Sequence, residues 1–361
     1  MRKLALLLGS LVVVASASAK EVVPAPVVVE EAPVQIVEKE VIVYRDKEEG
    51  FRPNGYVDLQ YKYYGDTENH DEWNVTPGNS SRTQLEGKIQ MTEKQALDFR
   101  VRDFNSLDKE NERASSGTQT RIRYYYDHGT LGDSKVGTES FVRYEKKSAQ
   151  ELEYRFNFQF ADYFFNNDFV KTTNFVVGPR VIYKWGSTND DAYTTTLGLY
   201  ADIVNQHPWG FATEIEIDGL HYNMYGDRTV KDSESPVVDG IRNGKLNYKD
   251  NDVSLAVAAK LLHNANLYSA ERVSLDWAFE GGYDPYTWHS IDRVEGATHY
   301  MDATYELYAQ PTVTLTYQAT EFVSLYATAG AEYRNWTRTN ESSASHWRWQ
   351  PFGVVGFRTT F

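Results

Sequence analysis

The stretch Glu151–Phe160 reads ELEYRFNFQF, and large apolar side chains alternate in it with polar or charged ones. Its apolar members are Leu152, Tyr154, Phe156, Phe158 and Phe160. Successive side chains of a β-strand point to opposite faces, so a strand gathers these side chains on one face, whereas a helix would spread them around its circumference. The stretch therefore predicts a strand with one face out of water, as in a soluble β-sandwich or a membrane β-barrel.

The same alternation returns in segment after segment from Gly55 onward. Clear examples are YVDLQYKYY (56–64), RTQLEGKIQM (82–91), ALDFRVRDF (96–104), TQTRIRYYY (118–126), FATEIEID (211–218), VSLAVAAKL (253–261) and VSLDWAFE (273–280). Around Gly219 the apolar parity slips by one residue, from Ile217 to Leu220, which predicts a β-bulge at the glycine.

The connections between these segments alternate in length. Long polar ones follow residues 64, 104, 225 and 281 and precede 346, with shorter ones near 145–150 and 186–192. Tighter connections are expected at 92–95, 127–134, 205–209, 262–270 and 318–321. We take Met301 to Tyr317 as one long strand interrupted by Pro311, which keeps the strand number even. The count is then about fourteen strands of about 10 residues or more, with both ends of the barrel region on the short-turn side.

Two physical arguments favour a barrel over a sandwich. The polar face carries full charges, several of them arginines, while the apolar face is rich in Tyr, Phe and Trp near the strand ends, as in aromatic girdles. About fourteen similar strands also need their edges removed, which closure achieves, and a barrel of that size is too wide for side chains to fill. The predicted fold is therefore all-β, a transmembrane antiparallel β-barrel of about 14 to 16 strands, closed by the C-terminal strand.

The composition excludes several function classes. The 361 residues include no cysteine, which rules out a disulfide scaffold and thiol metal sites. A formal net charge of -14 and the lack of a basic arm argue against nucleic-acid binding. The sequence contains no P-loop, dinucleotide fingerprint, HExxH or GxSxG motif, so we expect no enzyme activity, no cofactor and no metal.

The N-terminus predicts export. Met1-Arg2-Lys3 is a basic n-region, LALLLGSLVVVAS (4–16) is an apolar h-region, and Ala17-Ser18-Ala19 is a cleavage site. We expect a signal peptide at residues 1–19, a periplasmic spacer rich in Val, Pro and Glu at 20–50, and the barrel at 51–361. The predicted location is the bacterial outer membrane, with outer-membrane lipid as the surrounding partner.

The last stretch, HWRWQPFGVVGFRTTF (346–361), alternates to its terminal aromatic residue. It is similar to the terminal signature that the barrel-insertion machinery reads, with Phe357 and Phe361 as the signal residues. KLALLLGSLVVVASASAKEVVPAP (3–26), EKEVIVYRD (38–46) and FRPNGYVDLQYKYYG (51–65) resemble the opening of the fusobacterial major outer-membrane porins, the FomA-type family. The resemblance implies a homotrimer that forms a water-filled, weakly selective diffusion channel.

Charged residues at the polar parity predict the lining of the barrel. A basic wall is expected on the first seven strands, at Lys62, Arg82, Lys88, Arg100, Arg102, Arg121, Arg123, Arg143, Arg155, Arg180 and Lys184. An acidic wall is expected on later strands, at Asp202, Glu214, Glu216, Asp218, Asp276, Glu280, Asp302, Glu306 and Glu332. Walls that face each other would set up a field across the water column. The alternative is pairing between neighbouring strands, with Asp58, Glu86, Asp98, Glu139 and Glu153 among the arginines.

These observations favour a general-diffusion porin, through which small hydrophilic solutes and ions pass. A substrate-specific channel would need a track of inward aromatic side chains, for which the candidates are Tyr125, Phe141, Tyr200 and Tyr308. A surface adhesin would use the long outer connections, of which 226–247 is the longest and could also fold inward to narrow the pore.

Overall fold

The structure is a computed structural model of the 361-residue chain. It describes residues 50–68, 79–107, 117–147, 149–186, 193–226, 230–233, 237–238, 241–242, 246–290, 293–295, 299–301, 307–336 and 346–361. The chain divides into two units, Met1–Gly50 and Phe51–Phe361. The first unit lies outside the described residues except for Gly50, so the expected signal peptide and spacer stay predictions.

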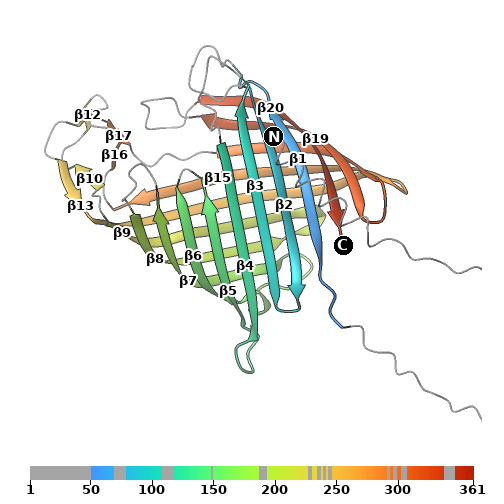
Figure 1. Cartoon of the computed structure of the whole chain (residues 1–361), viewed down its shortest axis with the longest axis horizontal. Coiled ribbons are helices and arrows are strands. Elements are labelled where there is room, and N and C mark those ends of the chain that lie inside the picture. Colours follow the sequence, from blue (N-terminus) through green and yellow to red (C-terminus); the bar gives the residue numbers. More distant parts are fainter. Residues whose placement is uncertain are drawn as a thin grey trace, which may run out of the picture. The chain divides into compact units, whose positions relative to one another are not determined.

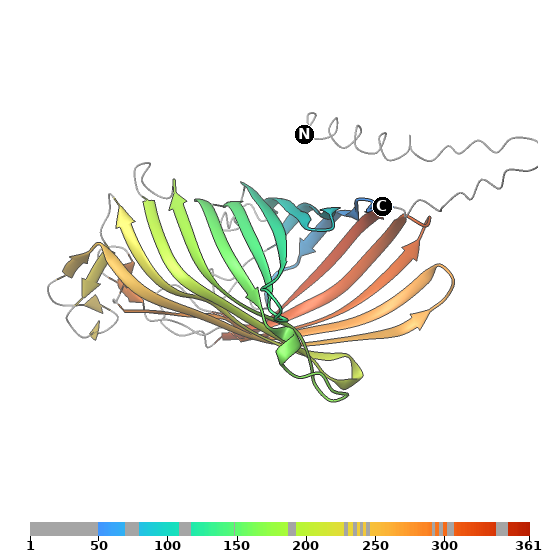
Figure 2. The same ribbon diagram turned by 90° about the horizontal axis from the view of Figure 1, so that it is seen from below.

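The second unit contains a closed antiparallel barrel of fourteen strands, which confirms the predicted fold class. Figures 1 and 2 show the strands following one another around the wall in chain order. They are β1 (Asn54–Tyr64), β2 (Ser80–Thr92), β3 (Gln95–Ser106), β4 (Gly117–Thr130), β5 (Gly137–Lys146), β6 (Gln150–Gln159), β7 (Lys171–Trp185), β8 (Tyr193–Gln206), β9 (Phe211–Gly226), β14 (Asn251–Ser269), β15 (Val273–His289), β18 (Leu307–Gln318), β19 (Val323–Trp336) and β20 (His346–Thr360).

The C-terminal strand closes the barrel, as predicted. β20 pairs with β1 from Tyr56 opposite Thr360 to Tyr64 opposite Phe352. Beyond the ladder, the Gly55 N–H donates to the Phe361 carbonyl at 3.0 Å, and the Phe361 N–H donates to the Gly55 carbonyl at 3.1 Å. Closure satisfies the backbone groups that an open edge would leave without partners, which is the condition for surviving in hydrocarbon.

Pro311 lies inside a single barrel strand, and its ring explains a gap in the pairing. It sits opposite Phe279 of β15, while the ladder between β18 and β19 passes from Ala309 directly to Thr312. Proline has no N–H to donate, so it is tolerated where the ladder is already interrupted. The expectation that this strand begins near Met301 is wrong, because Met301 belongs to β17 (His299–Met301), which pairs outside the barrel.

The tight turn expected at 262–270 is also wrong. β14 runs on to Ser269, with Asn264 opposite Ala278 and Asn266 opposite Asp276, and the turn to β15 covers only 270–272. Asparagines are common in turns, but they also suit a strand face that meets water. Polar residues on the inner face therefore look like a connection in the sequence.

The β-bulge predicted at Gly219 is present, and the extra residue is Asp218. On one side Leu220 pairs with Leu199 and Ile217 with Ala201; on the other side Gly219 pairs with Ala256 and Ile217 with Val257. The bulge re-aims the Asp218 side chain, which reaches Arg180 on β7, two strands away.

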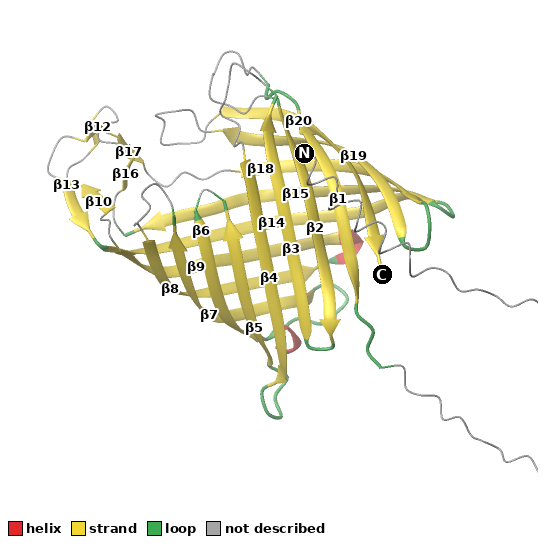
Figure 3. Cartoon of the chain, in the orientation of Figure 1, coloured by secondary structure: helices red, strands yellow, loops and turns green. Residues whose placement is uncertain are grey.

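Short strands lie in the long connections. β10 (Val230–Ser233) pairs with β13 (Leu246–Lys249), and β11 (Val237–Val238), β12 (Ile241–Arg242), β17 and β16 (Arg293–Glu295) form a second small sheet. Two 3₁₀ turns, η1 (Ala161–Tyr163) and η2 (Pro208–Gly210), are drawn in red in Figure 3. Among the residues that the structure describes, no helix is long and apolar enough to cross a membrane.

Contacts that skip a strand identify the inner face. The Tyr326 hydroxyl of β19 donates to Asp58 of β1 at 2.7 Å, past β20, and Arg100 of β3 pairs with Glu145 of β5 at 3.6 Å, past β4. Side chains converge on the concave side of a barrel and diverge on the convex side, so these contacts form inside. The charged parity is therefore the inner one.

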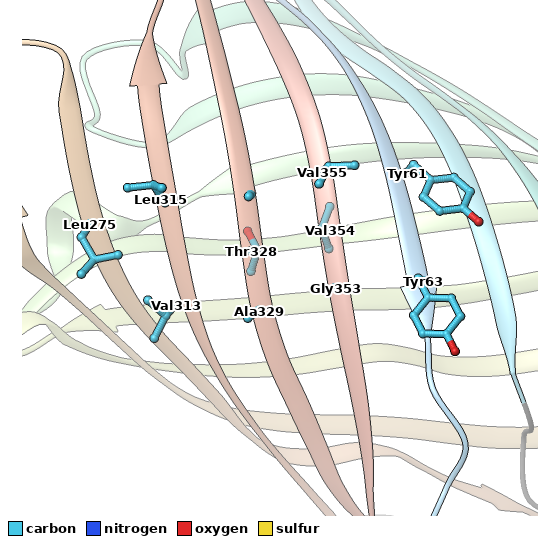
Figure 4. A pocket seen from close by; sticks show the side chains of 11 residues that line it. Tyr61, Tyr63, Leu275, Val313, Leu315, Thr328, Ala329, Gly353, Val354 and Val355 are labelled. Atoms are coloured by element: carbon cyan, nitrogen blue, oxygen red, sulfur yellow. The ribbon is translucent and has the colours of Figure 1, made fainter.

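The outer face carries apolar side chains that no other part of the described chain covers. Leu199 and Leu315 are each 49% exposed and Val355 is 56% exposed. Figure 4 looks onto this face, where a hollow of about 560 Å³ spans β1, β15 and β18–β20. Tyr61 and Tyr63 flank the hollow on one side and Leu315 on the other, with the small residues of β19 and β20 between them.

Candidate functional site: the charged interior of the barrel

Strand register brings the basic positions onto one face. Lys62 lies opposite Arg82, Arg100 opposite Arg121, and Arg155 opposite Arg180. The remaining members follow through Lys88 opposite Asp98, Arg102 opposite Gln84, Arg123 opposite Arg143, and Lys184 opposite Glu151. Cross-strand partners share a face, so all of these side chains belong to the inner parity of β1–β7.

The acidic positions that the structure describes lie on the same inner parity of later strands. Asp202 is opposite Glu216, and Glu214 is opposite Lys260 of β14. Asp276 and Glu280 of β15 lie opposite Thr314 and Gln310. The strand order places β8, β9, β14 and β15 next to one another, so these carboxylates form one sector. Asp302 and Glu306 lie outside the described residues.

Glu153 is the centre of an ion cluster on β5, β6 and β7. Its carboxylate lies 2.7 Å from Arg143 Nη2, 3.3 Å from Arg155 Nε and 3.0 Å from Arg180 Nη2. The Glu153 and Arg180 side chains are each only 2% exposed. Arg180 also pairs with Asp218 at 3.1 Å. One buried carboxylate therefore holds three guanidinium groups.

Further pairs compensate the neighbouring arginines. Arg143 pairs with Glu145 at 3.1 Å and contacts Glu151, while Arg121 pairs with Asp98 at 3.3 Å. The neighbour-pairing alternative thus describes much of the basic wall. Sequence reasoning missed Glu145 and Glu151, although both share the inner parity with residues that it identified.

The acidic sector is compensated less by cations. Lys260 Nζ donates to Glu214 at 2.9 Å, but Asp202 accepts from the amide of Asn174. The Tyr200 hydroxyl donates to Glu216 at 3.0 Å, and the Tyr308 hydroxyl donates to Glu280 at 2.6 Å. Neutral donors leave the negative charge of these carboxylates in place, so this sector keeps a net negative field.

The inward aromatic residues support an arginine and do not form an open track. The Arg155 guanidinium lies 4.0 Å from the Phe141 ring centroid and 3.8 Å from that of Tyr200. Tyr125 packs edge-on against Phe141 at 5.2 Å. Phe141 is 2% exposed, so its face is covered by the guanidinium and is not presented to a solute.

Three inward arginines were missed in the sequence. Arg334 on β19 and Arg348 on β20 lie opposite each other, and Arg358 shares their parity. Arg358 Nε donates to Asp58 at 2.9 Å, and Arg334 Nε donates to Glu332 at 2.6 Å. In β20 the aromatic residues on the outer face are the more conspicuous pattern in the sequence. The same alternation places Arg348 and Arg358 on the inner face.

Among the described residues, no group of three or more His, Asp or Glu side chains is arranged to hold a metal ion. The proposed signal residues lie on the outer parity of β20, with Phe357 opposite Leu59 and Leu325 and with Phe361 half exposed at the end of the strand. Their role in insertion stays a prediction.

No protein-family model and no curated protein matches this chain. Among solved structures, it is similar to a bacterial polysaccharide outer membrane secretin at 9% identity and a TM-score of 0.39, covering 85% of this chain and 98% of that one. The outer membrane channel DcaP of Acinetobacter baumannii gives 10% identity and 0.36, covering 86% and 96%, and an anion-selective porin from Comamonas acidovorans gives 10% and 0.32, covering 86% and 99%. At these values the likeness identifies no family, and the FomA-type resemblance stays a prediction.

Proposed function

We propose that this chain is a bacterial outer-membrane porin of the general-diffusion type. Small hydrophilic solutes and ions would cross passively through a charged, water-filled lumen. The observation that carries the proposal is the closed fourteen-strand barrel with an apolar, uncovered outer face and full charges on its inner face. The two faces suit different solvents, hydrocarbon outside the barrel wall and water inside it. Exposed apolar patches larger than a few hundred Å² are rare on soluble monomers, so the outer face suits lipid.

Aromatic clusters at both ends of the outer face support a membrane setting. Toward the short turns, Phe160 and Phe164 pack on Phe175 with ring centroids 5.9 and 4.4 Å away. Toward the long connections, Tyr333 stacks on Trp347 at 5.0 Å. Two such belts are what a barrel places at the two membrane–water boundaries.

The inner charges support a passive channel with weak selectivity. Barrels of about 8 strands are filled by side chains, whereas those of about 16 to 18 leave an aqueous channel. The negative sector of β8, β9, β14 and β15 lies across the ring from the arginine-rich wall. An electric field between the two favours polar solutes over apolar ones. Internal pairing such as the Glu153 cluster removes much of the net charge from the basic wall, which weakens any preference between anions and cations.

The remaining parts of the proposal rest on the sequence. The homotrimer follows from the resemblance of the N-terminal region, and recognition by the barrel-insertion machinery follows from the terminal aromatic pattern. Light scattering of the purified protein in detergent tests the first, and the yield of folded barrel after deleting Phe361 tests the second.

Conductance in a planar bilayer tests the proposed function. Purified protein should give stepwise, ohmic openings whose size scales with salt concentration, and liposomes that contain it should swell in small sugars. A barrel that inserts and binds surface partners but never conducts would overturn the porin and favour an adhesin. Saturable transport of one solute would favour a substrate-specific channel, although the covered face of Phe141 speaks against it.

A further inference from the structure

Three inward cations near the long-connection end of the barrel are not paired with any carboxylate that the structure describes. Lys62 and Arg82 are direct cross-strand partners on β1 and β2, and Arg102 follows on β3, where its Nε donates to Gln84 at 2.6 Å. Each cation interacts electrostatically with its neighbour. The Tyr64 phenol interacts electrostatically with Arg82 and Arg102. We call Lys62, Arg82, Arg102 and Tyr64 the upper cation cluster.

Within the described part of the chain, no carboxylate oxygen comes within 4.0 Å of a charged nitrogen of this cluster. The nearby carboxylates are engaged by other groups. Glu332, which acts electrostatically on Lys62 and Tyr64, accepts from Arg334 at 2.6 Å, and Glu86 accepts from the Gln84 amide at 2.7 Å.

One amide and two rings contact these cations, and none of the three carries a negative charge. The Gln84 amide lies between Arg102 and Glu86. Its oxygen accepts from Arg102, and its Nε2 donates to Glu86 at 2.7 Å. The Lys62 ammonium lies 3.7 Å from the Phe352 ring centroid and 4.5 Å from that of Tyr64. Like charges placed directly opposite on neighbouring strands destabilise a sheet, so the cluster weakens the barrel unless an anion joins it.

We propose that the upper cation cluster binds the phosphate group of a small solute, either inorganic phosphate or a phosphomonoester. Guanidinium groups match phosphate oxygens in pairs, and a lysine adds a point charge. The Tyr64 hydroxyl can donate one more hydrogen bond. This inference deepens the porin proposal and rests on it, because the cluster faces the water that the channel would hold.

The test is an equilibrium titration of the full-length protein with phosphate, in detergent at low salt. Binding is measured by the broadening of the ³¹P NMR line of phosphate. The test variant is Arg82→Gln/Arg102→Gln. The control is Lys88→Gln/Arg123→Gln, which removes the same charge from the same inner wall outside the cluster. Each lost charge-assisted contact should weaken binding about tenfold, so the test variant should bind about a hundredfold more weakly, while the control changes less than about threefold. Glycerol phosphate in place of inorganic phosphate shows which source of the group binds more tightly.

Stability supplies a second readout, because the test variant removes repulsion. It should resist urea at least as well as the wild type, whereas loss of phosphate binding through misfolding would lower the unfolding midpoint. Should the double variant fail to fold, Lys62→Gln alone must still weaken phosphate binding. The site is wrong if the wild type shows no saturable binding, or if the control loses as much as the test variant.

Bilayer currents separate this inference from the proposed function. Chloride current that phosphate blocks in the wild type but not in Arg82→Gln/Arg102→Gln supports both. Open channels that phosphate never blocks, together with no binding in detergent, overturn the site and leave the porin standing. Saturable binding by a barrel that never conducts supports the site and overturns the porin.

Discussion

Replacing Glu153 by glutamine should destabilise the barrel more than any other single change of an inner carboxylate on β5 or β6. The substitution keeps the volume and removes the charge that three arginines share. Arg143 retains Glu145 and Glu151, and Arg180 retains Asp218, but Arg155 has no other carboxylate within 4.0 Å in the described residues. The cost therefore falls mainly on Arg155, which loses its carboxylate partner.

The magnitude follows from burial. Glu153→Gln leaves Arg155 without the carboxylate that lies 3.3 Å from its Nε. Removing one partner of a buried ion pair costs about 3–5 kcal/mol. We expect the free energy of unfolding of Glu153→Gln to fall by about 3–5 kcal/mol, measured by reversible urea unfolding in lipid vesicles.

The matched control is Glu139→Gln on β5. Glu139 lies on the same inner face but accepts only from the Asn157 amide at 3.0 Å and has no ion pair among the described residues. It should cost about 1 kcal/mol or less. If the two variants lose the same stability, the Glu153 cluster is not a buried ion network and the reasoning fails.

Three further predictions follow from other parts of the barrel. Asp58, 0% exposed, joins β1 to β19 and β20 through Tyr326 and Arg358. Asp58→Asn should therefore lower the unfolding free energy by about 3 kcal/mol and slow the closure of the barrel during refolding. Refolding at the wild-type rate would contradict this prediction. Changing Arg100, Arg102, Arg121 and Arg123 to glutamate should move the reversal potential in a salt gradient toward cation selectivity, and an unchanged potential would remove these residues from the conduction path. Leu199→Arg, on the outer face, should cost about 2–4 kcal/mol in lipid, whereas a cost near zero would mean that Leu199 meets water.

The sequence predicts the face of each residue well and its neighbours poorly. Strict alternation has one period, so the inner parity of Arg121 or Glu216 follows as soon as the strand is recognised, and the slip at Gly219 marks the bulge. The pairing of Arg100 with Glu145 or of Arg180 with Asp218 does not follow, because it depends on the stagger of strands two apart.

Strand ends are hidden for a related reason. A barrel with a wet interior places polar residues inside strands, and Asn264 and Asn266 in β14 look like a turn although both pair with β15. Met301 fits the parity of β18 across an intervening segment, yet it pairs in a small sheet of the long connections. The local sequence pattern does not determine where either strand ends, because that depends on which residues the neighbouring strand pairs with.

The central claim is that hydrocarbon lies outside the barrel wall and water inside it. The chain has no cysteine, so a single cysteine can be placed at Ile215, which is 51% exposed on the outer face, or at its neighbour Glu214 on the inner face. Spin labels at the two positions in lipid vesicles should report opposite solvents, with Ile215→Cys relaxed by oxygen dissolved in lipid and Glu214→Cys by a water-soluble nickel chelate. Equal access of the nickel chelate to both, or the reverse assignment, would contradict the account.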